Sequence, residues 1–387
     1  MRKIKYCALT TISSSMKSFM LPALYELKEN GFEITVACAA DDELAEQIKN
    51  DMRYFPLDIS RGFNLKKTIS NIFCLARFFR KEKFDVIEYG TENVSLCASV
   101  AGFLAGTPIR IYDHWGARYV GLTGISRFLS VWIERIAALF STDIRQVSNL
   151  NSEMCVKQRI YPKRKVKVLG KGGTIGVDFN KFDCSKKEEY RKSVTESYRL
   201  SDNAIIFGYV GRIQRDKGIN ELLSAFKEIY RKDNNAFLIL VGPIDTENPI
   251  LEDNYNWAKA CPNVIFTGYV SDIYRWMGAF DILVHPTYRE GFGMVLQEAA
   301  AMKTPIITTD IMGPGEFIND EKTGILVNAK DSEDLKNAMI KMKEHKELRL
   351  EFAEKCYDYT KENFERSVMV KRILEDRKNL AEKKGII

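Results

Sequence analysis

The chain has 387 residues, of which 45% are hydrophobic and 28% are charged, and its net charge is +6. This balance is typical of globular proteins and excludes a disordered chain, while the length exceeds what one hydrophobic core usually serves, so we expect two domains. The eight cysteines show no close pairs and no histidines at metal-ligand spacing, which argues against a zinc site or a disulfide framework and favours a reducing compartment.

In the amino-terminal half, short apolar runs alternate with helical patterns. Four runs predict strands, at 4–9, 34–38, 85–89 and 109–112. The first run follows Met1-Arg2-Lys3 as the apolar part of a signal peptide would, but Lys5 interrupts it and it is too short. No stretch approaches the roughly 20 apolar residues that a membrane-spanning helix needs. We therefore expect a cytoplasmic protein whose membrane contact is at most peripheral, at the inner face of the cell membrane.

Residues 61–83 are strongly basic. One acidic residue, Glu82, opposes seven basic ones, and four phenylalanines are interleaved with them: Arg61, Lys66, Lys67, Arg77, Arg80, Lys81 and Lys83, with Phe63, Phe73, Phe78 and Phe79. Such a face suits anionic lipid headgroups. The sequence leaves open whether the segment contacts an anionic membrane or does not. Nucleic acid is the other usual partner of a basic patch, but no nucleic-acid-binding motif accompanies this one.

A second group of apolar residues has helical spacing: Phe128, Leu129, Trp132, Ile133, Ile136 and Phe140. Two interpretations are open, namely contact with a membrane and packing in the core of the domain. Core packing is favoured, because the apolar stripe of a helix in a globular protein usually faces the core.

His114 is one of only three histidines, and with Asp113 it follows the strand at 109–112. Trp115 and Gly116 come next, so imidazole and indole lie at the strand's carboxyl end, where ligands bind in open α/β sheets. The alternative is a loop histidine whose hydrogen bonds are satisfied within the protein.

A glycine-rich segment, Gly170-Lys171-Gly172-Gly173, follows a strand pattern at 166–169 and marks a hinge. We place the boundary there, with domains at 1–172 and 173–364 and a final helical segment at 365–387. Five further runs predict strands in the second domain, at 205–210, 236–241, 264–267, 281–285 and 305–308. Strands that alternate with helices predict an α/β fold with parallel sheets wound by helices.

The segment 290–298 reads Glu-Gly-Phe-Gly-Met-Val-Leu-Gln-Glu and joins a buried strand to a helix. The glycines beside Phe292 let the backbone pass close to a ligand, and the free amides of the new helix face an anion such as a diphosphate. Glu298 lies about one turn inside that helix, where a carboxylate can accept two hydrogen bonds from a cis-diol such as ribose. Glutamate is also common at helix starts because of the helix dipole, so the segment alone does not decide the matter.

A second motif, Gly211-Arg212, follows the strand at 205–210, and Lys217 stands five residues after Arg212. A glycine, a fork-shaped guanidinium and an ammonium can together neutralise a leaving diphosphate. The alternative is a solvated basic turn, since charged residues also lie between them.

With the segments Thr304–Glu316 and Gly176–Phe182, these motifs resemble the nucleotide-binding half of the retaining glycosyltransferases of family 4. The likeness spans most of the chain and is looser in the amino-terminal half, where Thr10–Ser15 stands in place of the Gly-Gly pair of many members. The resemblance implies the GT-B fold, in which two Rossmann-like, doubly wound parallel-sheet domains face a central cleft and the last helix crosses back to the first domain.

The resemblance also implies roles for individual residues. It implies catalytic roles for His114, Arg212, Lys217 and Glu290, with His114 touching the donor hexose. It implies donor-binding roles for Arg212, Lys217, Tyr269, Val270, Glu290, Gly291, Phe292, Gly293, Met294 and Glu298, with the base near Tyr269 and Val270. Glu316 is expected only to cap its helix. No Asp-x-Asp motif occurs, so we expect neither a metal nor any cofactor beyond the donor substrate.

We therefore expect retaining transfer of a hexose or N-acetylhexosamine from a UDP-sugar to an undecaprenyl-diphosphate-linked glycan. Segments 114–116 and 170–178 are similar to those of capsule and O-antigen assembly enzymes. Two alternatives stay open. A UDP-sugar 2-epimerase of the same fold would need more acid–base groups, for which three histidines leave little room. A catalytically silent subunit of a glycan-assembly complex would have no need of the full motif set.

Overall fold

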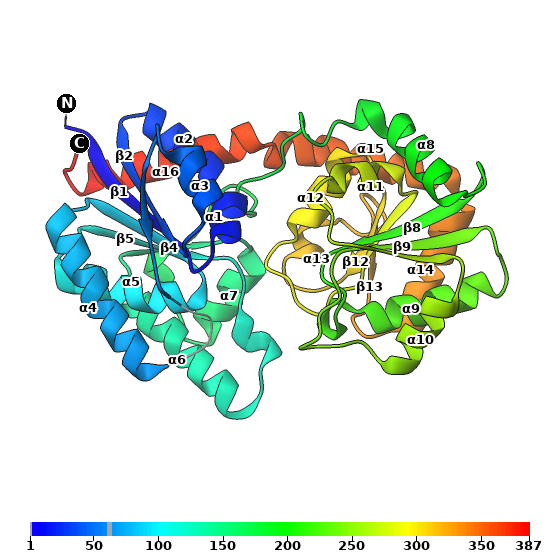
Figure 1. The fold of residues 1–387 in the computed structure, drawn as a ribbon, viewed down its shortest axis with the longest axis horizontal. Helices are drawn as coiled ribbons and strands as arrows, with labels where there is room; N and C mark the ends of the chain where they lie inside the picture. The colour runs from blue at the N-terminus through cyan, green and yellow to red at the C-terminus, as the bar shows by residue number, and fades with distance from the viewer. Residues whose placement is uncertain (1, 60–63) are drawn as a thin grey trace. The chain divides into compact units, whose positions relative to one another are not determined.

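The computed structural model describes residues 2–59 and 64–387, which form two compact units (Figure 1). The first unit runs to Ile175 and takes up the chain again from Ser367 to Ile387, and the second runs from Gly176 to Arg366. The boundaries expected from the sequence lie within three residues of these divisions.

The first unit is built on a seven-stranded sheet with the order β3-β2-β1-β4-β5-β6-β7, and every pairing is parallel. Its strands are β1 (Ile4–Leu9), β2 (Phe32–Cys38), β3 (Arg53–Pro56), β4 (Val86–Gly90), β5 (Ile109–His114), β6 (Asp143–Gln146) and β7 (Val166–Val168). Helices cover both faces, so the central strands are buried along nearly their whole length: all five residues of β4 and five of the six residues of β1 are buried. The sequence did not predict β3 and β6, which are short and carry charged residues.

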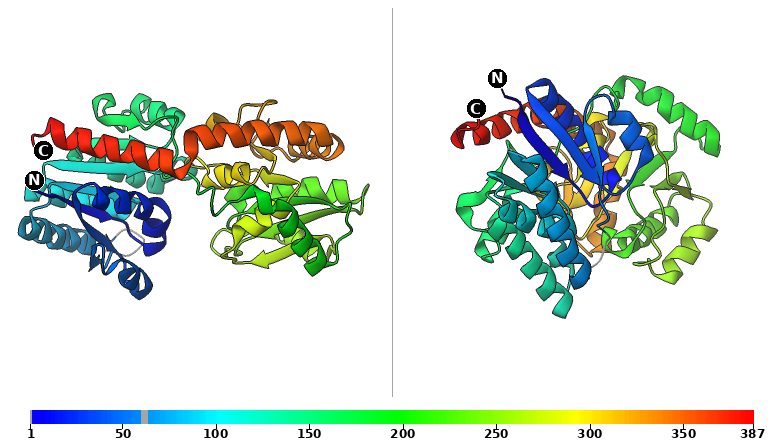
Figure 2. Two further views of the ribbon diagram at one scale, coloured as in Figure 1. Left: turned by 90° about the horizontal axis from the view of Figure 1, so that it is seen from above. Right: turned by 60° about the vertical axis from the view of Figure 1, so that its left-hand side comes forward.

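The helices of the first unit form two layers. They are α1 (Ser13–Phe19), α2 (Leu21–Glu29), α3 (Asp42–Ile48), α4 (Leu65–Glu82), α5 (Glu92–Ala105), α6 (Gly124–Phe140), α7 (Asn149–Lys157) and α16 (Arg366–Lys383). Residues of α1, α2, α3 and α16 pack on one face of the sheet, and residues of α4 to α7 pack on the other. Figure 2 shows α16, in red, lying along the sheet of the first unit.

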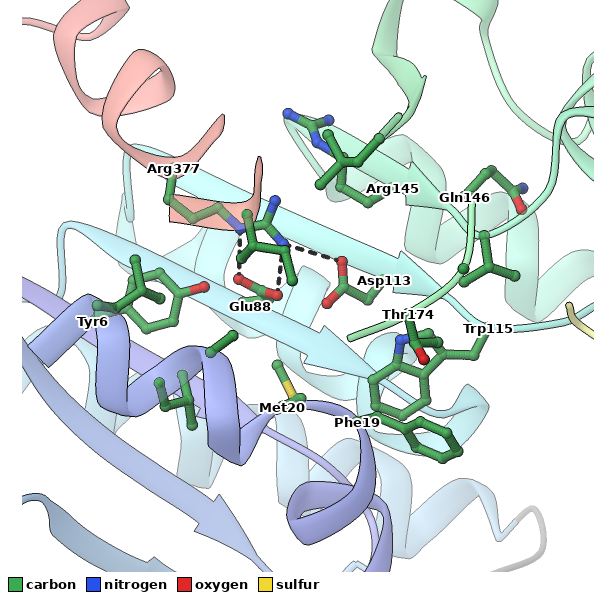
Figure 3. A pocket seen from close by; sticks show the side chains of 17 residues that line it. Tyr6, Phe19, Met20, Glu88, Asp113, Trp115, Arg145, Gln146, Thr174 and Arg377 are labelled. Carbon is green, nitrogen blue, oxygen red and sulfur yellow. Dashed lines mark hydrogen bonds and ion pairs between the residues drawn. The ribbon is translucent and has the colours of Figure 1, made fainter. Parts of the chain in front are cut away.

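A buried ion network holds α16 in place. Arg377 reaches from α16 to the carboxylate of Glu88 on β4, donating to its two oxygens at 2.7 and 2.9 Å (Figure 3). Asp376, the residue before Arg377, accepts a hydrogen bond from Arg145 of β6 at 2.8 Å. Buried charges are tolerated only when they are paired in this way. The chain's last helix therefore belongs to the first unit by its contacts.

The second unit has a six-stranded parallel sheet with the order β10-β9-β8-β11-β12-β13. Its strands are β8 (Ile205–Val210), β9 (Ala236–Val241), β10 (Val264–Gly268), β11 (Ile282–His285), β12 (Ile306–Thr309) and β13 (Ile325–Val327). The strand order reverses between β8 and β11, and ligands of open α/β sheets bind at the carboxyl ends beside such a reversal. The doubly wound parallel fold expected from the sequence is confirmed in both units.

The helices of the second unit are α8 (Lys187–Tyr198), α9 (Ile219–Tyr230), α10 (Glu252–Ala260), α11 (Ile273–Ala279), α12 (Met294–Ala301), α13 (Pro314–Phe317), α14 (Ser332–Glu344) and α15 (Lys346–Phe364). Residues of α9, α10 and α14 form the main core of this unit with the sheet. The short helix α12 begins directly after the loop that follows β11, which places the segment 290–298 at the sheet's carboxyl edge.

The predicted core packing of the apolar stripe at 128–140 is wrong for three of its six residues, while Ile133, Ile136 and Phe140 are half-buried. Phe128, Leu129 and Trp132 are 61%, 45% and 46% exposed. The buried positions of α6 are instead small or polar: Ser130, Glu134, Ala137 and Ala138. Small side chains let α6 lie close to its neighbours, and the large apolar side chains point outward.

Of the basic segment 61–83, Arg61 and Phe63 lie outside the described residues. In the remainder, which forms most of α4, Phe79 is buried and Phe73 is exposed. Nowhere in residues 2–59 and 64–387 does a helix have the length and apolar character that crossing a membrane requires.

Candidate active site

The two motifs of the second unit meet where the strand order of its sheet reverses. Lys217 lies in the turn after β8 and Glu290 in the loop after β11, and Lys217 Nζ donates a hydrogen bond to Glu290 Oε2 at 2.7 Å. Gly218 permits this close approach, because its φ is +70° and a Cβ there would stand 1.9 Å from the Pro286 carbonyl oxygen. The fold therefore places an ammonium and a carboxylate side by side at the edge where ligands bind.

Glu290 is held in its charged form. Burial raises its pKa, but the attraction of Lys217 and the contact with His285 outweigh burial and hold the pKa well below its usual range. His285 Nε2 lies 3.6 Å from Glu290 Oε2, and burial lowers the pKa of the imidazole. A neutral imidazole thus lies beside an ionised carboxylate near pH 7. The carboxylate can accept hydrogen bonds from sugar hydroxyls, and Lys217 can attract a diphosphate.

Arg212 is accessible to a ligand. Its side chain is 59% exposed, and the guanidinium donates to Asp245 Oδ2 at 2.9 Å. The Tyr209 hydroxyl donates to the Arg212 carbonyl oxygen at 2.9 Å, which holds the backbone of the turn while the side chain projects. Exposed ion pairs contribute only about 0–1 kcal/mol, so a diphosphate can compete with Asp245 for the guanidinium.

Among the described residues, no side chain caps the start of α12, where Gly293 precedes the helix with φ +88°. The Leu296 amide donates to the Gly293 carbonyl oxygen at 3.1 Å, and the amides of Met294 and Val295 stand before the first intrahelical hydrogen bonds. The Phe292 ring is 4% exposed and packs on Phe317 and Phe364, with centroids 6.1 and 5.4 Å away. Of the donor contacts expected at 291–294, Phe292 can therefore offer only its backbone, and the helix amides remain as an anion site.

Glu298 lies inside α12, one turn from its start. Among the described residues, no hydrogen-bond partner of its carboxylate is found. Burial raises the pKa of Glu298 to about 7, and the positive charges of Lys181 and Arg366 oppose burial only in part. A carboxylate with free acceptor positions suits a cis-diol, as the sequence predicts.

Tyr269 and Val270 follow β10, the edge strand of the sheet, and β9 separates β10 from β8. The Tyr269 side chain is 80% exposed. The Gly242 amide donates to the Gly268 carbonyl oxygen at 3.0 Å, which ties this loop to the end of β9. No described contact brings Tyr269 to Glu290, so a base site at Tyr269 and Val270 stays a prediction.

The expected capping role of Glu316 is confirmed. Its carboxylate accepts a hydrogen bond from the Gly313 amide at 3.3 Å at the start of α13. This carboxylate satisfies a backbone donor that the helix leaves without a partner.

His114 lies in the interior of the first unit. It is the last residue of β5 and is 1% exposed. Its Nδ1 lies 2.8 Å from Gln146 Oε1, its Nε2 lies 3.8 Å from Glu134 Oε2, and the rings of Tyr112 and Tyr161 meet it edge-on. A ligand does not reach the imidazole in this conformation. The expected contact between His114 and the donor hexose stays a prediction.

A small pocket lies on the other face of the same sheet (Figure 3). Its volume is about 40 Å³, which is room for a few water molecules and too little for a sugar. Two of the residues that line it carry a buried polar atom with no described hydrogen-bond partner, namely Tyr6 Oη and Thr174 Oγ1. Ordered water would satisfy them.

Both halves of the chain match known family models. The model described as "Glycosyl transferases group 1" matches residues 191–359, and "Glycosyl transferase 4-like" matches residues 8–147. The capsular polysaccharide biosynthesis glycosyltransferase CapM of Staphylococcus aureus is 33% identical over 86% of this chain and 85% of its own length. The chain is a group 1 glycosyltransferase.

Solved structures agree with the fold of this glycosyltransferase. A glycosyltransferase of Rickettsia africae covers 98% of the chain with a TM-score of 0.79 at 19% identity, and 99% of that structure is covered. An Escherichia coli galactosyltransferase is a further relative in sequence, 23% identical over 90% of this chain and 89% of its own length. The GT-B fold expected from the motifs is confirmed.

Sequence reasoning missed two aromatic residues of the glycosyltransferase that connect its motifs. His285 ends β11, and its ring stacks on Tyr209 of β8 with centroids 5.9 Å apart and an interplanar angle of 12°. His285 faces Glu290, and Tyr209 holds the backbone of Arg212. The available signal was a polar ring at the end of each of two otherwise apolar strands.

The sequence also gave no role to Asp216 beyond its charge. Its side chain accepts from Arg289 Nη2 at 2.7 Å, and its carbonyl oxygen accepts from the Tyr288 amide at 3.0 Å. Asp216 thus ties the turn after β8 to the loop after β11 and sets the separation of Lys217 and Glu290.

Proposed function

We propose that the enzyme transfers a hexose or N-acetylhexosamine, with retention of configuration, from a UDP-sugar to an undecaprenyl-diphosphate-linked glycan in surface polysaccharide synthesis. The observation that carries this proposal is the 2.7 Å hydrogen bond from Lys217 Nζ to Glu290 Oε2, which lies where the strand order of the sheet reverses. It joins a cation suited to a diphosphate with an anion suited to sugar hydroxyls, beside the open start of α12.

The names of relatives support the donor and acceptor classes. CapM is named for capsular polysaccharide biosynthesis. The Escherichia coli relative is named UDP-Gal:alpha-D-GlcNAc-diphosphoundecaprenol alpha-1,3-galactosyltransferase, and a Campylobacter jejuni relative acts by name on a diphospho-undecaprenol-linked sugar. We assign the same classes to this chain.

The reaction breaks the bond between the anomeric carbon and the oxygen of the β-phosphate. Arg212, Lys217 and the first amides of α12 stabilise the charge that develops on the departing diphosphate. The acceptor hydroxyl attacks from the face that the diphosphate leaves, and its proton passes to the departing phosphate oxygen. An α-linked donor therefore gives an α-linked product. Glu290 orients the donor sugar through its hydroxyls, and Glu298 holds the ribose diol.

We propose that no metal takes part, because side chains supply the positive charge that the diphosphate needs. The sequence has no Asp-x-Asp motif, and the described residues hold no group of three or more His, Cys, Asp or Glu side chains placed to bind an ion. Full turnover in excess EDTA is the expected result, and loss of turnover that Mg²⁺ or Mn²⁺ restores would contradict this part of the proposal.

We also propose that the enzyme works peripherally at the inner face of the cell membrane, where a polyprenyl-linked acceptor is held. The exposed basic residues of α4 support this placement, since anionic headgroups attract them.

A thermal-stability screen of nucleotide sugars tests the donor class. A bound donor raises the melting temperature by mass action, so UDP-sugars should stabilise the enzyme and GDP-sugars should not. The best donor is then incubated with an undecaprenyl-diphosphate-linked acceptor, and product configuration is read by NMR. Release of a 2-epimer without acceptor would show an epimerase instead, and no stabilisation by any UDP-sugar would contradict the proposal.

A further inference from the structure

The outer helices of the first unit carry a concentration of exposed apolar side chains. Of the eighteen large apolar residues that are exposed in the described chain, ten lie on α4, α5 and α6: Leu65, Ile69, Phe73, Phe103, Leu104, Ile125, Phe128, Leu129, Trp132 and Leu139. The helices are neighbours, and α5 packs between α4 and α6 (Figure 1). Scattered apolar residues are normal on a protein surface, but a gathered set marks an interaction surface. We call this surface the α4–α6 face.

On α6 the exposed residues form one stripe. Ile125, Phe128, Leu129 and Trp132 are spaced at i, i+3, i+4 and i+7, and Leu139 continues the stripe two turns later. The opposite side of α6 is buried through small or polar side chains. The large apolar side of this helix is therefore turned away from the core, which is the arrangement of a helix that meets an apolar partner outside the protein.

The charge around this stripe is positive. On α4, Lys66, Lys67, Arg77, Arg80 and Lys81 are exposed, and on α6 Arg127 is exposed. Each of the three helices has one acidic residue, and none of the three is free: Glu82 pairs with Arg53, Glu92 pairs with Arg118, and Glu134 is buried. The α4–α6 face thus offers apolar and cationic groups and no unpaired carboxylate among its described residues.

We propose that the α4–α6 face is a docking surface for an anionic phospholipid bilayer. The apolar stripe of α6 enters the headgroup boundary, and the basic residues of α4 contact the headgroups. Trp132, whose ring lies 5.4 Å from the Arg135 guanidinium, is the kind of side chain that gathers at such a boundary. This inference rests on the proposed function, in which a polyprenyl-linked acceptor is held in the membrane.

A second copy of the chain fits this face less well. A symmetric dimer through the α4–α6 face would bring like charges together, because a twofold interface places the same patch on both partners. Anionic lipid complements both features of the face, the apolar stripe and the positive charge.

A matched pair of variants tests the proposal. Ile125→Ser with Phe128→Ser removes two exposed residues of α6, and Leu251→Ser with Leu350→Ser removes two exposed leucines of the second unit as a control. Binding is measured by co-sedimentation with phosphatidylcholine vesicles that contain phosphatidylglycerol. We expect the α6 variant to bind at least about tenfold more weakly than wild type and the control to bind normally.

The electrostatic part of the contact is tested separately. Salt should weaken the binding of wild type to these vesicles, and replacing Arg77, Arg80, Lys81 and Lys83 with Gln should abolish it.

The position of Trp132 gives a second readout. Brominated lipids should quench wild-type tryptophan fluorescence, and Trp132→Phe should lose this quenching although the other three tryptophans remain. Unchanged vesicle binding by the α6 variant would overturn the proposal. If that variant also converts a dimer to a monomer in light scattering, the face is an interface between copies.

The test separates this inference from the proposed function. Transfer to an acceptor with a short, detergent-soluble lipid should be equal in wild type and the α6 variant, because that assay needs no bilayer. A wild-type protein that binds vesicles but transfers no sugar would contradict the proposed function alone.

Discussion

Glu290 and Glu298 stand on one short segment, yet their surroundings move their pKa values in opposite directions. For both carboxylates burial raises the pKa. Lys217, 2.7 Å away, and His285 together outweigh burial for Glu290, whereas no salt bridge to Glu298 is found among the described residues. The sequence placed both carboxylates at the site, but the residues that decide their charge come from distant parts of the chain.

Donor affinity should therefore depend on pH through Glu298. With a pKa of about 7, the ionised fraction rises about tenfold between pH 6 and pH 8, so affinity for an unreactive UDP-sugar analogue should rise by about the same factor. Calorimetry across this range measures the effect. In Glu298→Gln the dependence should vanish, and in Glu316→Gln, which changes only a helix cap, it should persist. Glu298→Ala should lose roughly 2 kcal/mol of binding at pH 8.

The raised pKa of Glu298 also affects stability, which should fall as pH rises, whereas donor affinity should rise. The folded state holds the Glu298 proton more tightly than the unfolded chain, whose ordinary value is 4.5. The contribution of Glu298 to stability therefore falls as pH rises from about 4.5 to about 7, and it is constant above that.

For the binding measurement, a donor affinity independent of pH would show that Glu298 does not hold the diol.

Turnover should depend on the cations of the site. Lys217→Ala and Arg212→Ala should each lower kcat by about a hundredfold or more, because each side chain stabilises charge that develops on the leaving diphosphate. Lys217→Ala should also lower the melting temperature, since it leaves Glu290 without its cation, while Arg212→Ala should not, since Arg212 is exposed. Lys232→Ala, an exposed lysine after α9, is the control. Near-normal kcat in both variants would show that the diphosphate binds elsewhere in the protein.

At the scale of elements, the site depends on how closely the loop after β8 approaches the loop after β11. Strand patterns located both loops in the sequence. Their contact follows from the sheet order, in which β8 and β11 are neighbours although β9 and β10 lie between them in the chain. His285 and Tyr209 were missed because their roles arise only when these two strands pair.

Gly218→Ala should separate the two loops. A Cβ there meets the Pro286 carbonyl oxygen at 1.9 Å, and φ is +70°. Gly106 has a similar φ of +75° with nothing within 4 Å of a Cβ, so Gly106→Ala isolates the backbone strain of about 1 kcal/mol. We expect Gly218→Ala to lose at least about 2 kcal/mol in urea unfolding and to weaken donor binding, because overpacking adds to that strain. Equal losses in the two variants would show that the loops can move apart freely.

The wrong prediction of core packing for the apolar stripe of α6 also has its reason in how elements pack. Helical spacing identified an amphipathic helix correctly, but spacing does not say which side faces inward. Ser130, Ala137 and Ala138 face inward, because α6 packs closely against α5.

At the scale of the whole molecule, the chain forms most of the first unit, then the second unit, and returns to the first unit with its last helix. The final helix is tied into the first unit by Arg377, whose side chain is 2% exposed. Burial lowers the pKa of this guanidinium, but Glu88 and Asp113 outweigh burial and raise it well above its usual range. The network makes the last helix part of the folding unit that begins the chain.

Arg377→Ala should destabilise the first unit by about 3–5 kcal/mol, because it leaves the buried carboxylate of Glu88 without its cation. Urea unfolding followed by circular dichroism measures the loss. Lys371→Ala, an exposed residue of the same helix, should change stability by less than about 0.5 kcal/mol. A small loss for Arg377→Ala would mean that the network does not hold α16 to the sheet.

The sequence by itself determined the α/β class, the two doubly wound sheets, the family and the two donor-site motifs, because strand periodicity, glycine placement and motif spacing are local properties of the chain. Some strands of three or four residues, such as β3 and β13, were not predicted, because so few residues carry little pattern. Only the tertiary structure decided which side chains share a site and which are buried. It paired Lys217 with Glu290, enclosed His114 among Glu134, Gln146 and two tyrosines, and turned the apolar side of α6 outward. Each of these depends on contacts between residues far apart in the chain, and local pattern carries no information about such contacts.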